Sequence, residues 1–181
     1  MNSDFKDDYY RMTGKKYRFG ITFLFIMVYS HQIRYMYWWR KAHNKSTMIR
    51  KYILYKYSRK YGLEIGSGAT IGHGLYLGHP YNITVSNGSK IGNNVNLHKG
   101  CTIGRENRGK RYGSPTIGNC VSVGINSTIV GKITIGDDVL IAPNSYVNFD
   151  VPSHSIVIGN PAVIHHRDNA TEEYINFRIE G

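Results

Sequence analysis

An aliphatic residue returns every six positions from Ile65 onward, and this period constrains the fold more than any other feature. A helix repeats every 3.6 residues and a strand every two, so neither alone gives a period of six. Three strand steps of two residues do, if the strand keeps turning corners. The thirteen positions of the series are all Ile, Leu or Val: Ile65, Ile71, Leu77, Ile83, Ile91, Leu97, Ile103, Ile117, Val123, Ile129, Ile135, Ile141 and Val147.

Glycine and small residues accompany this series. Eight of the thirteen aliphatic residues are followed directly by Gly, which has the backbone freedom that a sharp corner needs. Small residues stand four places after the aliphatic one, as at Ala69, Cys101, Ser127 and Ser145. Aliphatic side chains that point inward on successive coils stack into one continuous core. We therefore predict a parallel β-helix, interrupted by a two-residue slip after Ile83 and by a longer insertion after Ile103.

Several segments resemble the hexapeptide-repeat acyltransferases, namely "IGSGATIGHGLYLGH", "IGNNVNLHKGCTIG", "PTIGNCVSVGINSTIVGKITIGDDVLIAPNSYV" and "IVIGNPAVI". The closest pattern is that of the serine O-acetyltransferase branch, because "LEIGSGATIGHGLYLGH" has its spacing from an acidic residue to a His. The resemblance implies an all-β solenoid, a left-handed parallel β-helix, assembled as a homotrimer with active sites between subunits. We expect a helical segment over 1–61, the acyltransferase domain over 62–166 with a loop at 104–116, and a tail over 167–181.

The resemblance also implies an acetyl-CoA-dependent transfer with a His as base. His79 takes the place of that base, and Glu64 that of the acidic residue that orients it, although the branch has Asp there. One additional methylene moves the carboxylate by about 1.5 Å. His79 could also be a solvated corner residue, and Glu64 could simply begin the first strand. His73 and His98 are the competing bases, of which His73 is expected at a solvent-facing corner and His98 in a substrate-binding or structural role.

The loop "RENRGKRYGS" carries five charged residues among ten and interrupts a strict repeat. Such insertions fall on the working face of a repeat protein, so we favour a flap over the acceptor to a solvated hairpin. Its candidate substrate-binding residues are Arg105, Arg111 and Ser114. The resemblance places the coenzyme along the later coils, with these candidates: Gly124, Asn126, Lys132, Ala142, Pro143 and Arg167. Cys101 is expected to pack inward, and no metal-binding spacing occurs.

The acceptor is interpreted from charged residues that the chain lacks. Serine acetyltransferases have an Arg-His pair where this chain has Gly113 and Ser114, and an acidic residue where it has Gly78. We therefore predict a sugar hydroxyl of a capsular or exopolysaccharide unit as acceptor. The alternative is L-serine, as in serine O-acetyltransferase. A third hypothesis is a catalytically inactive hexapeptide protein that only binds a partner.

The first sixty residues are aromatic and basic, in a chain of net charge +11. The apolar run Phe19–Ser30 is too short to span a bilayer. It predicts one helix, and the stretch between Ser46 as N-cap and Gly62 as stop predicts a second. Aromatic and basic residues beside a short apolar helix favour a peripheral contact with the inner face of the membrane. The alternative is packing on the base of the trimer. Two cysteines without metal spacing indicate the cytoplasm, and the mixture of cations with apolar residues speaks against nucleic acid.

Overall fold

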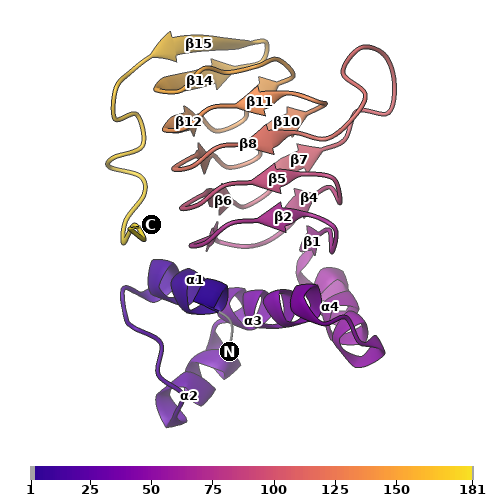
Figure 1. Cartoon of the computed structure of the whole chain (residues 1–181), viewed down its shortest axis with the longest axis vertical. Helices are drawn as coiled ribbons and strands as arrows, with labels where there is room; N and C mark the ends of the chain where they lie inside the picture. The colour runs from indigo at the N-terminus through magenta and orange to yellow at the C-terminus, as the bar shows by residue number, and fades with distance from the viewer. Residues whose placement is uncertain (1–2, 181) are drawn as a thin grey trace.

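The computed structural model describes residues 3–180, and it contains four helices followed by a three-sided parallel β-helix (Figure 1). Each coil contributes one short strand to each of three sheets, which we call A, B and C in chain order. Sheet A holds β1 (Glu64–Ile65), β4 (Thr84–Val85), β7 (Thr102–Gly104), β10 (Thr128–Val130) and β13 (Tyr146–Val147). Sheet B holds β2 (Thr70–Ile71), β5 (Lys90–Ile91), β8 (Thr116–Ile117) and β11 (Thr134–Ile135).

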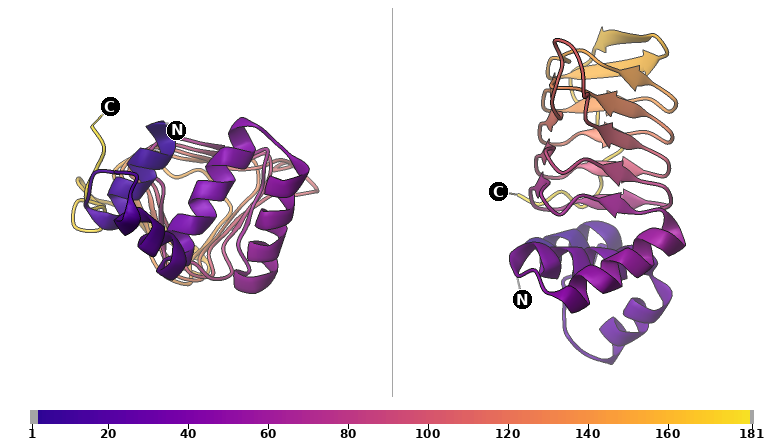
Figure 2. Two further views of the ribbon diagram at one scale, coloured as in Figure 1. Left: turned by 90° about the horizontal axis from the view of Figure 1, so that it is seen from below. Right: turned by 90° about the vertical axis from the view of Figure 1, so that its right-hand side faces the viewer.

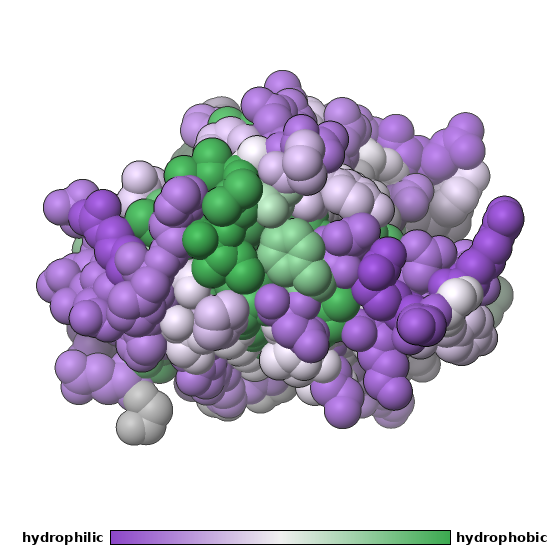
Figure 3. Space-filling view, turned by 90° about the horizontal axis from the view of Figure 1, so that it is seen from above, coloured by the Kyte–Doolittle hydropathy of each residue, from purple (hydrophilic) through white to green (hydrophobic). Residues whose placement is uncertain are grey.

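Sheet C is the longest sheet and closes the upper end of the solenoid. It holds β3 (Tyr76–Gly78), β6 (Asn96–His98), β9 (Ser122–Val123), β12 (Val139–Ile141), β14 (Ser155–Gly159) and β15 (Ala162–His166). All pairings between coils are parallel, whereas β14 and β15 form an antiparallel hairpin. Viewed from above, the end of the solenoid shows an apolar patch within a polar surface (Figure 3), where Ile158 and Val163 are exposed.

The core confirms the six-residue period. All thirteen aliphatic positions of the series are buried, as are Ala69, Cys101, Ser127 and Ser145. The predicted place of the slip is wrong. Val85, and not Ile83, is in register with Ile65 below it and Ile103 above it. The two additional residues therefore lie in the corner before Val85, between sheets C and A.

The helical part has four helices where two were predicted. They are α1 (Ser3–Thr13), α2 (Ile21–Tyr29), α3 (His31–Asn44) and α4 (Met48–Tyr61). The N-cap of α4 is Thr47, whose hydroxyl accepts a hydrogen bond from the Arg50 backbone N–H, and not Ser46 as predicted. Gly62 ends α4 in the left-handed conformation, as predicted. None of the described helices is long and apolar enough to cross a bilayer.

Helices α1 and α3 lie across the lower end of the solenoid (Figure 2) and cover its first coil. Trp39 donates its indole N–H to the Ile65 carbonyl at 3.1 Å. Arg40 forms a buried ion pair with Asp8, 2.8 Å between Nε and Oδ2, and donates to the carbonyls of Ile71 and Gly72. The open backbone groups of the first coil thus find their partners in the helices.

The C-terminal tail runs back down the outside of the solenoid toward α1 (Figure 1). Its Thr171 hydroxyl donates to the Asp138 carboxylate at 2.8 Å, and Asn96 donates to the Tyr174 carbonyl at 2.9 Å. At the base, the ring of Phe177 meets Tyr10 of α1 edge-on, with 5.9 Å between ring centroids. The tail therefore fastens the upper coils to the helical base.

Candidate active site

Three edges run along the solenoid where one sheet passes into the next. We call them the A–B, B–C and C–A edges. Corners on the C–A edge stack through backbone hydrogen bonds: Gly100 N–H donates to the Tyr81 carbonyl, Asn126 N–H to Lys99, and Asn144 N–H to Ile125. This edge contains His79 and most of the residues predicted to bind the coenzyme.

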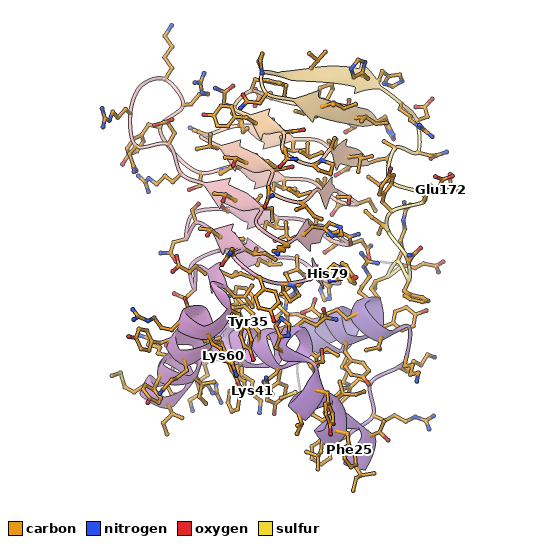
Figure 4. The ribbon with its side chains drawn as sticks, turned by 180° about the vertical axis from the view of Figure 1, so that it is seen from behind. Phe25, Tyr35, Lys41, Lys60, His79 and Glu172 are labelled. Carbon is orange, nitrogen blue, oxygen red and sulfur yellow. The ribbon has the colours of Figure 1, made fainter. Side chains whose placement is uncertain are left out.

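His79 lies in the corner that carries the two additional residues. Its side chain, labelled in Figure 4, is exposed, whereas the next residue, Pro80, is buried. The imidazole of His31, at the start of α3, lies 3.3 Å from the Pro80 carbonyl through Nε2 and stacks on Tyr61. The His79 backbone has a φ of 47°, but nine other non-glycine residues among 3–180 share this left-handed conformation, most of them in corners. The longer corner and its support from α3 distinguish His79, and its backbone angle does not.

His98 lies on β6 directly above Gly78, one residue before the position that stacks on His79. A Cβ built on Gly78 would approach within 2.8 Å of the His98 Cε1 atom, and closer still to Nδ1. The imidazole therefore occupies the space that a side chain at residue 78 would need. His98 is half-buried, and burial lowers its pKa, which the nearby His79 lowers further. The resulting neutral ring beside His79 can donate or accept a hydrogen bond.

Glu64 begins β1, next to the C–A edge. It pairs with Thr84 of β4, the strand that follows the corner containing His79. Its exposed side chain lines a cavity of about 510 Å³ between α4 and sheet A, together with Tyr35, Lys51 and Ser86. Within residues 3–180, no ion pair or hydrogen bond joins Glu64 to His79. The orienting role of Glu64 therefore stays a prediction.

The coenzyme candidates Gly124, Asn126, Ala142 and Pro143 lie on the C–A edge, above His79. Gly124 is required by packing, because a Cβ there would lie 2.7 Å from the Ile141 carbonyl oxygen and from the Pro143 nitrogen. Coils can stack this closely only where the side chain is absent. The edge thus offers a surface of backbone and small side chains above the histidines.

The remaining predicted residues lie on other edges. Arg105, Arg111 and Ser114 belong to the loop that leaves the A–B edge (Figure 1), where Glu106 pairs with Gly113. Lys132 lies next to this loop, in the corner between β10 and β11, and its N–H donates to the Arg111 carbonyl at 2.8 Å. The loop accounts for the 26 residues between the paired positions Ile103 and Ile129, which compares with 18 between Val85 and Ile103.

Arg167 lies on the B–C edge, where its N–H donates to the His154 carbonyl at 2.8 Å. In a single chain it is thus separate from both the C–A edge and the loop. His73 is also at the B–C edge, half exposed, with its Nδ1 2.8 Å from a carboxylate oxygen of Asp7. No group of three or more His, Cys, Asp or Glu residues within 3–180 has the geometry of a metal site.

Sequence reasoning missed Lys99. This exposed residue follows His98, and its N–H donates to the Gly78 carbonyl at 2.9 Å, which places it in the corner above His79. In the described part of the chain its ammonium group has no ion-pair partner. The coil repeat could have found it, since Lys99 is twenty residues after His79 and the neighbouring coils are offset by twenty.

Comparison with known proteins supports the fold and the branch. Residues 114–148 match the family model described as bacterial transferase hexapeptide (six repeats). The chain is 38% identical over 101 residues to serine acetyltransferase of Helicobacter pylori, covering 56% of this chain and 59% of that protein. It is 34% identical over 144 residues to serine acetyltransferase of Staphylococcus aureus, covering 78% and 64%. The resemblance to the hexapeptide-repeat acyltransferases of the serine acetyltransferase-like branch is confirmed.

Solved structures agree with this hexapeptide-repeat assignment. Serine acetyltransferase from Brucella abortus superposes with a TM-score of 0.74 at 26% identity, covering 93% of this chain and 68% of that one. The Neisseria gonorrhoeae enzyme in complex with serine gives 0.71 at 27% identity, covering 90% and 66%. Because solenoids of opposite hand do not superpose, this chain winds as those structures do, in the left-handed direction implied by the resemblance. The homotrimer stays a prediction.

The comparisons also correct the predicted acceptor. The relatives and the solved structures are serine acetyltransferases, so the expectation of a sugar hydroxyl in a capsular or exopolysaccharide unit is wrong. That expectation relied on charges that are missing at Gly78, Gly113 and Ser114. The structure shows that the space next to Gly78 is filled by His98 and that the nearby corner carries Lys99.

Proposed function

We propose that this protein is an acetyl-CoA-dependent O-acetyltransferase whose acceptor is the hydroxyl group of L-serine. The observation that carries the proposal is the C–A edge. His79 lies on one coil, His98 and Lys99 lie on the coil directly above it, and the small residues predicted to bind the coenzyme lie on the later coils. Two titles among the similar structures name the same ligands, a soybean serine acetyltransferase complexed with serine and a serine acetyltransferase complex with CoA. The chain spans about six tenths of the Helicobacter and Staphylococcus relatives, so the activity is proposed on the site as well as on the likeness.

The chemistry needs a base, an oriented hydroxyl and a thioester. In this proposal the imidazole of His79 accepts the proton of the serine hydroxyl as its oxygen attacks the thioester carbonyl. The carbonyl π electrons move to the oxygen, giving a tetrahedral oxyanion. When the oxyanion collapses, the C–S bond breaks, and the departing thiolate takes the proton from His79. The products are O-acetylserine and CoA, with no covalent enzyme intermediate. Glu64 is proposed to orient His79, as in catalytic triads.

Lys99 is the proposed binding partner of the acceptor carboxylate. The Arg-His pair of the branch is replaced by Gly113 and Ser114, and the exposed ammonium of Lys99 has no carboxylate partner among residues 3–180. Its neighbour His98, kept neutral by burial, supplies a hydrogen-bonding ring on the same coil. We assign Lys99 to the carboxylate of L-serine and His98 to the polar groups near its hydroxyl.

The site is proposed to be completed between subunits. Arg105, Arg111, Ser114 and Lys132 lie on the A–B edge, away from His79 on the C–A edge. In a trimer, the A–B edge of one subunit can face the C–A edge of the next, which would bring the loop over the neighbour's His79. In that arrangement Arg105, Arg111 and Ser114 are the candidates for contacting the substrate, and Lys132 supplies a cation for the coenzyme phosphates. Arg167, on the third edge, is the weakest of the coenzyme candidates.

The place of action is proposed to be the cytoplasm. Both cysteines are free in the structure, Cys101 buried and Cys120 half-buried, as expected of a reducing compartment. The peripheral contact with the inner face of the membrane stays a prediction. It concerns the helical base and is independent of the chemistry at His79.

The proposed activity is tested by thiol release from acetyl-CoA. We expect release that depends on L-serine, and no release with L-alanine, which has the same two charged ends but lacks the hydroxyl. Lys99→Gln should raise KM for L-serine by about 10-fold or more, as expected for one hydrogen bond to a charged group, and leave KM for acetyl-CoA unchanged. Release that is equal with the two amino acids, or absent with both, would contradict the proposal.

A further inference from the structure

Helix α2 exposes an apolar face that no part of the described chain covers. Every residue of α2 except Thr22 is apolar or aromatic, and a helix of this kind is normally buried on all sides. Four side chains at i, i+3, i+4 and i+7 are instead exposed by half or more: Ile21, Leu24, Phe25 and Val28. They form one stripe, and Figures 1 and 4 show α2, on which Phe25 is labelled, at the end of the molecule farthest from the solenoid.

The opposite side of α2 is held firmly, so the stripe has a fixed orientation. Phe23 is buried, and its ring meets Tyr17, Tyr37 and Phe5 at centroid distances of 5.0 to 6.3 Å. At the other end of α2, the guanidinium of Arg34 donates to the carbonyls of Met27 and Val28, each at 2.9 Å. The exposed apolar stripe is therefore a surface built by the fold and not a frayed end.

The charge of the protein gathers in the same part of the chain. Residues 1–61 contain 14 Lys and Arg against three Asp, whereas residues 62–181 contain nine of each sign. The whole net charge of +11 thus belongs to the helical base. Nine of its cations are exposed: Lys6, Lys15, Lys16, Arg18, Lys45, Lys51, Lys56, Arg59 and Lys60.

The three carboxylates of the base do not balance these exposed cations. Asp8 is buried against Arg40, Asp7 contacts His73 of the first coil, and Asp4 lies 3.9 Å from Arg40. All three are thus engaged on the side of the base that faces the solenoid. Among residues 3–61, no carboxylate is exposed, whereas nine Lys and Arg residues are.

We propose that this face docks on an anionic lipid bilayer, with α2 lying in the interface and its four-residue stripe inserted among the headgroups. Apolar side chains flanked by Lys and Arg are what binding to an anionic membrane surface requires. Lys15, Lys16 and Arg18 directly precede α2, close enough to contact lipid phosphates while the stripe is inserted. A second copy of the chain is a poorer occupant, because two bases of the same net charge would repel each other.

Flotation of the full-length protein with vesicles tests the proposal. Vesicles of phosphatidylcholine with phosphatidylglycerol are compared with phosphatidylcholine alone, at low and at high salt. The double variant Leu24→Glu/Phe25→Glu removes the stripe. The double variant Ile158→Glu/Val163→Glu is its matched control, since it places two glutamates in the exposed apolar patch at the opposite end of the solenoid.

We expect wild type and the control to float with anionic vesicles at low salt and less at high salt, and the stripe variant to stay unbound. A second pair addresses charge without touching α2. Lys15→Gln/Lys16→Gln should weaken binding about 25-fold, about fivefold for each cation near the surface, whereas Arg108→Gln/Lys110→Gln in the loop should leave it unchanged. This pair keeps the test decisive if the stripe variant does not fold.

Three outcomes would overturn the proposal. They are failure of the wild type to float on anionic vesicles, equal flotation of the stripe variant, or equal binding to neutral vesicles at every salt concentration. If wild type does not float and only the stripe variant changes its mass in light scattering, a second copy covers α2 instead. Thiol release from acetyl-CoA is measured in parallel, and it decides the proposed activity separately.

Discussion

Gly78 and His98 face each other in register on neighbouring coils, and the imidazole of His98 fills the space that a side chain at residue 78 would take. Gly78→Ala should therefore displace His98 and lower the free energy of unfolding by about 1–3 kcal/mol, the usual cost of overpacking. In a His98→Ala background the same substitution should cost much less, since the ring is absent. Urea unfolding of wild type, the two single variants and the double variant, all at one protein concentration, measures this coupling. An equal loss in both backgrounds would show that the contact does not explain Gly78.

The buried pair between Asp8 and Arg40 joins the helical base to the first coil. Arg40→Met should cost about 3–5 kcal/mol, because it leaves Asp8 buried without its partner. His73→Gln is the matched control, since it removes a half-exposed partner of Asp7 and should cost less than about 1 kcal/mol. Thermal unfolding at one protein concentration compares the two. Similar losses in both variants would mean that the buried pair does not hold the base.

Asp138 should make the docking of the C-terminal tail sensitive to acid. Burial opposes its ionisation, but hydrogen bonds from the backbone and hydroxyl of Thr171, from Ala170 and from His154 outweigh this, so its pKa is lowered below 3.8. The ionised Asp138 carboxylate thus stabilises the docked tail above pH 3.8, and this stabilisation is lost as the pH falls through the lowered pKa.

Hydrogen exchange of residues 167–180, corrected for its intrinsic pH dependence, follows the tail. Protection in the wild type should persist to about pH 4 and fall below it, whereas Asp138→Asn should show weak protection at every pH. Full protection in this variant would place the anchor elsewhere, for example at the hydrogen bond between Asn94 and Ile179.

Cys101 should take no part in the reaction. Its thiol is buried, and burial raises its pKa to about 12, so it stays protonated and unreactive at neutral pH. Cys101→Ser should keep wild-type turnover within a few fold, and mass spectrometry of the protein with acetyl-CoA should find no acetylated cysteine. An acetylated Cys101, or loss of turnover with coenzyme binding intact, would indicate a covalent pathway instead of direct transfer.

The solenoid was predictable because its signal is repeated thirteen times and each position obeys the same packing rule. The slip was misplaced because Ile83 and Val85 are both aliphatic, so the sequence fits either register. Helices α1 and α3 were missed for a different reason. Their buried faces carry Asp8, Arg11 and Arg40, which are charged residues that only tertiary ion pairs and hydrogen bonds allow inside.

The candidate site was predictable in part. The resemblance indicated His79 and, on the later coils, Gly124; both lie on the C–A edge, and His98 pairs with Gly78 next to His79. Lys132 and Arg167 were grouped with that edge because of their charge, whereas Lys132 lies in the corner between β10 and β11 on the A–B edge and Arg167 follows the β14–β15 hairpin at the B–C edge. The six-residue period itself places Lys132 between Ile129 and Ile135, whereas the antiparallel hairpin before Arg167 departs from that period and was not predicted.

The central claim is that His79 is the base for acetyl transfer to L-serine, and His79→Ala tests it most directly. The measurement is L-serine-dependent thiol release from acetyl-CoA, with the Kd of acetyl-CoA as a control for intact coenzyme binding. The account predicts that turnover falls by about 10²–10⁴ while the Kd stays unchanged, and that His98→Ala loses less. Wild-type turnover in His79→Ala, with the larger loss in His98→Ala, would contradict it and move the base to the next coil.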